Sequence, residues 1–173
     1  NILANIIGLT GAGTAAIAID DGIDMGNANA TVNIGDGTTG GRNVVSGNTA
    51  DGMGLDAGTF SVKGNYVGVG SDGTTIINNG NKSIIVTNTS GSVPSIVVGG
   101  SGDNKNKISN SANIGLYISD ITPSNEATMD TDNTWTVTSN PTYKFWSRYV
   151  ASVLTASGPQ VCYDGLDNDG DGK

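Results

Sequence analysis

The chain has 173 residues, a formal net charge of −8, 27 glycines and only 14% charged residues. With 36% hydrophobic residues it is too apolar and too weakly charged for a disordered protein. Its 8 lysines and arginines are scattered, so we expect no basic face and no nucleic-acid partner. No apolar run approaches the roughly 20 residues that cross a bilayer, so we also expect no membrane span.

Short apolar pieces recur along residues 1–120, separated by Gly, Asn and Asp. Each piece alternates with period two and is too short for a helix, which predicts β-strands joined by tight corners. The residues are mostly Val and Ile, which suit a narrow stacked interior. The clearest pieces are Ile6-Ile7, Val44-Val45, Met53 with Leu55, Phe60 with Val62, and Val67 with Val69.

The same phrases return at a fixed spacing. Residues 5–14 align with residues 65–74 at an offset of 60, and residues 42–48 align with residues 105–111 at an offset of 63. A fixed period in a strand-rich, Gly-rich chain predicts a solenoid of two or three coils per period. The corner asparagines are then expected to stack from coil to coil as hydrogen-bonded ladders. These are Asn43, Asn48, Asn65, Asn106 and Asn110.

Three phrases in this order carry a family resemblance: Asn65-Tyr66-Val67-Gly68, Val98-Gly99-Gly100 and Asn106-Lys107-Ile108-Ser109-Asn110. They resemble the right-handed parallel β-helix repeats of large secreted bacterial proteins. The resemblance covers residues 1–120 and implies an all-β, pectin-lyase-like fold, a right-handed parallel β-helix solenoid. It implies no particular activity, because this fold carries enzymes as well as surface and adhesive proteins.

Residues 121–158 differ in character and are predicted to be an aromatic cap on the C-terminal end of the solenoid, since the open end of a stack must be covered. Within them a short helix is predicted over residues 143–155, because apolar residues follow helical spacing. A sugar- or partner-binding aromatic platform and a plain linker are the alternatives. The helical stripe consists of Trp146, Tyr149, Val150, Val153 and Leu154.

Residues 159–173 form an acidic tail with the start of a calcium loop. Asp167, Asp169 and Asp171 occupy loop positions 1, 3 and 5, and a glycine follows where the chain must turn sharply. Lys173 would add its backbone carbonyl as a further ligand. The tail resembles thrombospondin type 3-like and dockerin-like calcium loops, which implies Ca²⁺ as the cofactor. The alternative is a disordered, solvated acidic tail, and Cys162 is either a free thiol or half of a disulfide.

The inventory for catalysis is small, since the chain has no His and one Cys, which excludes the usual Ser/His and Cys/His nucleophile pairs. A glycoside hydrolase needs two carboxylates across a sugar cleft. Acids lie close together in the sequence of the repeat region in only two places, Asp20 with Asp21 and Asp24, and Asp51 with Asp56.

Pectate lyases of the resembled fold pair calcium-binding acids with a basic residue, and Arg42 is the candidate for that residue. Lys105 fills the equivalent repeat position, however, which favours a structural role for Arg42.

These observations favour a non-catalytic, structural or adhesive module of a larger secreted or cell-surface protein. We expect an extracellular monomer, with a polysaccharide or cell-surface glycan as the partner to consider. The alternative is a fragment of a polysaccharide lyase or glycoside hydrolase. The sequence starts inside a repeat unit and stops before the calcium loop is complete, and both observations suggest a piece of a longer chain.

The calcium loop gives the first testable prediction. With residues added after Lys173 to complete the loop, the tail should take up Ca²⁺, because the ion needs six to eight oxygen ligands. Calorimetry should detect this uptake, and Asp169→Ala should abolish it. The chain ending at Lys173 should bind weakly or not at all. No uptake by the completed loop at millimolar calcium would leave the solvated tail as the explanation.

Overall fold

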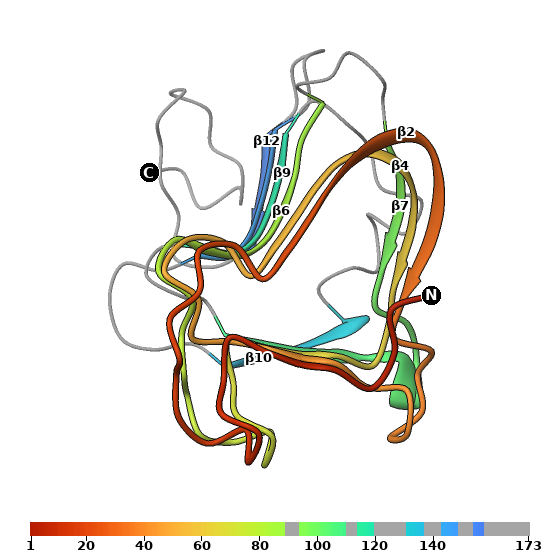
Figure 1. Cartoon of the computed structure of the whole chain (residues 1–173). Helices are drawn as coiled ribbons and strands as arrows, with labels where there is room; N and C mark the ends of the chain where they lie inside the picture. The colour runs from red at the N-terminus through yellow and green to blue at the C-terminus, as the bar shows by residue number, and fades with distance from the viewer. Residues whose placement is uncertain (89–93, 110–113, 120–130, 137–142, 149–153, 158–173) are drawn as a thin grey trace.

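The computed structural model describes residues 1–88, 94–109, 114–119, 131–136, 143–148 and 154–157. This part of the chain is all-β as predicted, with one short 3₁₀ turn, η1 (Gly102–Asn104), and no α-helix among the described residues. Its strands form two sheets, and Figure 1 looks along the stack of strands. The predicted class is therefore correct, and the strand pairing decides the finer architecture.

The first sheet has five strands and is parallel throughout. Strands that follow one another in this sheet are never joined by a hairpin, because the chain leaves for the other sheet between them. In sheet order they are β1 (Ile6–Ile7), β3 (Val44–Val45), β5 (Tyr66–Val67), β8 (Asn106–Ser109) and β10 (Asn133–Thr136).

The second sheet has seven strands, parallel except for the β11–β12 pair. The register between β2 and β4 shifts near Gly26, so each of these long strands spans two walls of the molecule, as Figure 1 shows. The first half of β4 pairs with β6 and its second half with β7. The strands are β2 (Ile23–Ile34), β4 (Met53–Val62), β6 (Lys82–Val86), β7 (Ser95–Val98), β9 (Ile114–Ser119), β11 (Tyr143–Arg148) and β12 (Leu154–Ser157).

The chain alternates between the two sheets, and one passage through both is called a circuit below. Successive circuits begin at asparagines separated by 38, 22, 41 and 27 residues. Long and short circuits therefore alternate, and two of them make up the repeat of the sequence. The circuits begin at Asn5, Asn43, Asn65, Asn106 and Asn133.

The register confirms the repeat alignment made from the sequence. Val45 and Ile108, which the alignment equated, lie in one row on either side of Val67. Ile7 and Val67, which it also equated, lie in one row on either side of Val45. Equivalent phrases are thus two circuits apart, and each period contains two circuits.

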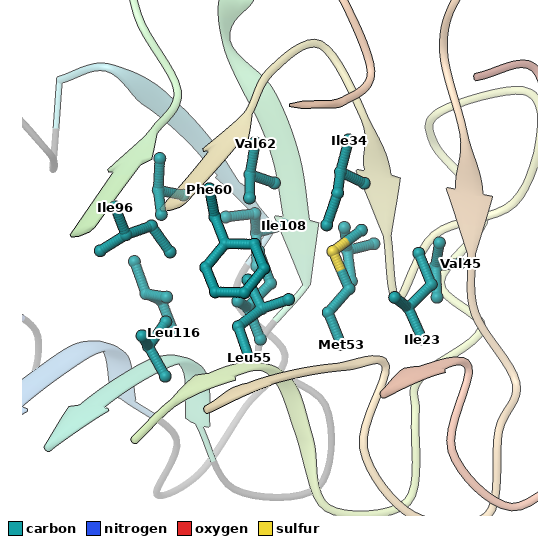
Figure 2. Close-up of a cluster of buried hydrophobic side chains, with 14 of the residues drawn as sticks. Ile23, Ile34, Val45, Met53, Leu55, Phe60, Val62, Ile96, Ile108 and Leu116 are labelled. Carbon is teal, nitrogen blue, oxygen red and sulfur yellow. The ribbon is translucent and has the colours of Figure 1, made fainter. Parts of the chain in front are cut away.

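Inward-facing positions of both sheets fill a continuous apolar core, because side chains alternate between the two faces of a strand. Figure 2 shows core side chains from facing walls pointing toward one another, with Phe60 in the middle. The core is built mostly from β-branched residues, as the composition predicts. Its fully buried members are Ile34, Val45, Met53, Leu55, Phe60, Val62, Val67, Ile84, Val86, Ile96, Val98, Ile108, Leu116 and Ile118.

Asparagines at one corner form a hydrogen-bonded ladder through all five circuits, called the asparagine ladder below. The side-chain oxygen of Asn65 accepts hydrogen bonds from the backbone N–H and the side-chain amide of Asn43, at 3.2 and 2.9 Å. The amide of Asn65 donates in turn to the oxygen of Asn106 at 3.1 Å. Asn43, Asn65 and Asn106 are completely buried, so the ladder satisfies polar groups that water cannot reach.

The predicted stacking is therefore confirmed for Asn43, Asn65 and Asn106, and Asn5 and Asn133 extend the same ladder. Asn48 belongs to a second, shorter ladder, in which its amide donates to the side-chain oxygen of Asn79 at 2.8 Å. Asn110 lies outside the described residues.

Alternate circuits carry the same corner loop, residues 8–17 in circuit one and residues 68–77 in circuit three. Each loop closes with an antiparallel bridge, Leu9 with Ala16 and Val69 with Ile76. The two loops also touch, because the Ser71 backbone N–H donates to the Gly13 carbonyl at 2.9 Å. Figure 1 shows them side by side, projecting from the same corner. The loops thereby join circuits one and three directly.

In the second loop the Asp72 carboxylate organises the turn. It accepts hydrogen bonds from the Thr75 hydroxyl and from the backbone N–H groups of Thr74 and Thr75. These bonds favour the charged form and hold the pKa of the Asp72 carboxyl far below its ordinary value. The Asp72 carboxylate thus connects the residues of this turn through three hydrogen bonds.

The helix predicted over residues 143–155 is wrong for the residues of this range that the structure describes, 143–148 and 154–155. Residues 143–148 form β11, which pairs in parallel with β9, and residues 154–157 form β12. Register places Phe145 beside Leu116, so pairing with an existing strand edge overrides a helical stripe only two turns long. The segment 121–158, predicted as a cap, thus contributes strands to both sheets.

The asparagine ladder predicts a large effect of Asn65→Ala. The change leaves two donors of Asn43 and the carbonyl of Ile34 without their partner. Each buried group left unpaired costs roughly 1–3 kcal/mol, so the free energy of unfolding should fall by about 3 kcal/mol or more. Urea denaturation measures this fall. Asn33→Ala, at an exposed position bonded to Asn1, is the matched control and should change little; equal losses in both variants would contradict the role of the ladder.

Candidate functional site

The structure gathers four aspartates around one depression on the outer face of the seven-stranded sheet. They come from two circuits, with Asp21 and Asp24 in circuit one and Asp51 and Asp56 in circuit two. The depression has a volume of about 400 Å³. Its lining consists of Asp21, Asp24, Gly26, Asp51, Gly54, Leu55, Asp56, Ile85 and Thr87.

Strand alternation places two of these carboxylates, those of Asp24 and Asp56, outside. Asp24 lies between the core residue Ile23 and the half-buried Met25, and Asp56 follows the buried Leu55. Gly54 pairs with Asp24, and a Cβ atom at Gly54 would lie 3.2 Å from the Asp24 Oδ1. Because Gly54 has no side chain, the space beside the Asp24 carboxylate stays open.

Three of the four carboxylates are engaged in holding neighbouring circuits together. Asp21 Oδ1 accepts the Asp51 backbone N–H at 2.9 Å, and Asp51 Oδ1 accepts the Lys82 backbone N–H at 2.8 Å. Asp56 accepts a hydrogen bond from the Thr87 hydroxyl at 3.1 Å. Asp24 is exposed, and no donor within the described residues reaches its carboxylate. Asp24 is thus the acid most available to a ligand.

An aromatic ring lies beside the depression, one strand further along the stack. Asp24, Gly54, Ile85 and Tyr117 follow one another in a single row across four strands. The Lys82 ammonium lies 5.4 Å from the centre of the Tyr117 ring. A carboxylate that accepts hydrogen bonds and an aromatic face at the two ends of one row can hold a polyhydroxylated ligand such as a sugar.

Arg42, the basic residue considered for catalysis, lies just before β3, a strand of the other sheet. Its guanidinium carbon is 4.1 Å from the centre of the Tyr66 ring, and its Nε donates to the Gly64 carbonyl at 3.0 Å. Lys107 approaches the same ring at 5.2 Å. The structure therefore brings the acids together but gives Arg42 the packing role that its repeat position suggested.

The predicted calcium ligands, Asp167, Asp169, Asp171 and Lys173, lie outside the described residues, as does Cys162. In the ranges that the structure describes, no three His, Cys, Asp or Glu side chains come together as metal ligands. Nor does a helix in those ranges have the length and apolarity to cross a membrane.

Sequence reasoning found the four acids as two separate groups and missed that they meet. The signal was present, because Asp21-Gly22 and Asp51-Gly52 are 30 positions apart and occupy equivalent places in consecutive circuits. Ile85, Thr87 and Tyr117 were not linked to the acids, since only the register of β4, β6 and β9 brings them into line.

Comparison with known proteins adds no relative: no protein-family model, curated protein or solved structure matches this chain.

Proposed function

We propose that the chain is a right-handed parallel β-helix solenoid serving as a non-catalytic, structural or adhesive module of a larger secreted or cell-surface protein. The asparagine ladder is the observation that carries this proposal. The same pair of hydrogen bonds joins circuit one to two, two to three and three to four. A body held by one repeated contact grows along one axis and forms a rod.

A rod of this kind accounts for where the different residue types lie in each circuit. Inward positions are apolar and asparagines occupy the corner, so successive circuits differ mainly in loops and outward residues. An exposed lateral surface on a rigid body is suited to spacing or adhesion. The resemblance of the repeats to those of large secreted bacterial proteins supports an extracellular location.

The second candidate function is binding or cleavage of a polysaccharide at the acidic depression. The exposed Asp24 carboxylate and the row that leads to Tyr117 favour it. If the chain is a lyase or hydrolase, it releases unsaturated or reducing sugars from pectin-like polymers, and Asp24→Asn abolishes the release. A binding role alone gives retention on the polymer without release. The structural proposal expects neither cleavage nor any effect of this substitution on the fold.

An internal duplication tests the rod directly. A second copy of residues 5–64 inserted between Gly64 and Asn65 keeps long and short circuits alternating. The longest dimension in small-angle X-ray scattering should rise by about 10 Å, because each parallel strand adds about 4.8 Å along the stack.

An inserted Gly/Ser linker of the same length is the control, and it should add a flexible, disordered contribution to the scattering. A duplication that enlarges the particle without lengthening it, or that unfolds it, would refute the solenoid.

A further inference from the structure

The end of the stack formed by circuit one is apolar and open. Three of the five exposed large hydrophobic residues in the described chain belong to circuit one: Ile6, Ile17 and Ile19, with exposures of 41, 56 and 40%. Ile7, Met25 and Val32, which pack against the core, are only partly buried. The surface defined by these six residues is called the end face below.

The same positions one circuit further on are fully buried. Ile7 pairs with Val45, Met25 with Leu55 and Val32 with Phe60. Those three partners are 0, 1 and 2% exposed. The residue types are equally apolar in both circuits, so the difference comes from having a neighbour on one side instead of two. The end face therefore leaves the core of circuit one incomplete.

Polar groups at this end of the stack also lack the hydrogen-bond partners that a neighbouring circuit would supply. Each inner step of the asparagine ladder uses a side-chain oxygen that accepts two hydrogen bonds from the preceding circuit, as Asn43 accepts from Asn5. Within the described residues no donor reaches the Asn5 oxygen. β1 and β2 are also the edge strands of their sheets, which present unpaired backbone groups.

Ile2 already occupies a place in a further circuit. Ile2 pairs in parallel with Ile34, in the row that continues through Val62 and Val98. The Ile2 backbone N–H donates to the Asn33 carbonyl at 2.8 Å, and the Ile2 carbonyl accepts from Gly35 at 2.9 Å. The row therefore extends one circuit beyond circuit one at this position.

We propose that the end face is a docking surface for one further parallel circuit of the same repeat chemistry. This inference depends on the proposed solenoid. The occupant carries an asparagine that donates to Asn5, followed by apolar residues at the places of Val45, Met53, Leu55 and Phe60. Its strands pair with β1 and β2 and cover the partly buried Ile7, Met25 and Val32.

Two other occupants fit the end face less well. A helix uses its backbone N–H groups internally, so it leaves the strand edges of β1 and β2 unpaired. A second copy stacked head to head brings one Asn5 acceptor against the other, and neither supplies the missing donor. A parallel circuit satisfies the apolar surface, the ladder and the strand edges together.

Fusing one extra circuit to the chain tests the proposal. A copy of residues 43–61 is placed directly before Ile2, so that Ile2 follows at the position of Val62. The urea midpoint of unfolding should shift upward, and the fluorescence of the apolar dye ANS should fall relative to the parent chain. The matched control carries Val45→Asp and Leu55→Asp in the added copy alone, and it should lose both effects.

A second control carries Asn43→Ala in the added copy and should lose part of the midpoint shift, since only the ladder donor is missing. An unchanged midpoint, or an equal shift in the Asp control, would overturn the proposal. So would sedimentation of the parent chain as a dimer that Ile17→Asp dissociates, because a second copy would then be the occupant. If the internal duplication lengthens the rod but this fusion has no effect, the solenoid stands and only this inference fails.

Discussion

The rest of the structure depends on the asparagine ladder, in which each buried side-chain amide accepts hydrogen bonds from one circuit and donates hydrogen bonds to the next. Asn43, Asn65 and Asn106 have no exposed surface, yet each amide is bonded to the circuit on either side. Leaving one of these polar groups unpaired in the interior costs more free energy than a typical hydrogen bond contributes to stability. The asparagine ladder therefore fixes the register of every circuit. Because period-two strands expose the opposite face after a slip of one residue, this register also decides which residues enter the core.

A fixed register explains why length can vary so much between circuits. The long circuits place their extra residues in corner loops and outer connections, and the loops 8–17 and 68–77 then bond to each other across the short circuit between them. The acidic depression arises in the same way. Asp21 and Asp51 occupy equivalent places, accept a backbone N–H from the next circuit and so bring Asp24 and Asp56 to one surface. Structural repetition and the candidate site therefore have one origin.

Prediction from sequence succeeded where the signal was local and repeated. Val44-Val45 and Val67 alternate with glycine and asparagine corners, and the offset of 60 residues identified equivalent phrases before any pairing was known. It failed for residues 143–148, which were predicted to begin a helix and instead form a strand beside β9. It also missed the link between Asp24 and Tyr117, which depends on the pairing of four strands and leaves no trace in neighbouring residues.

The sequence by itself determined the all-β class, the repeat of about 60 residues and the stacking of Asn43, Asn65 and Asn106, because each follows from residue type at regular spacing. Only the tertiary structure decided how the two halves of β4 divide between β6 and β7, which acids meet at the depression, and which apolar positions remain half-buried at the end face. These outcomes depend on contacts between segments about 20 to 60 residues apart. Periodicity shows that such segments are equivalent, whereas pairing alone shows which of them are neighbours.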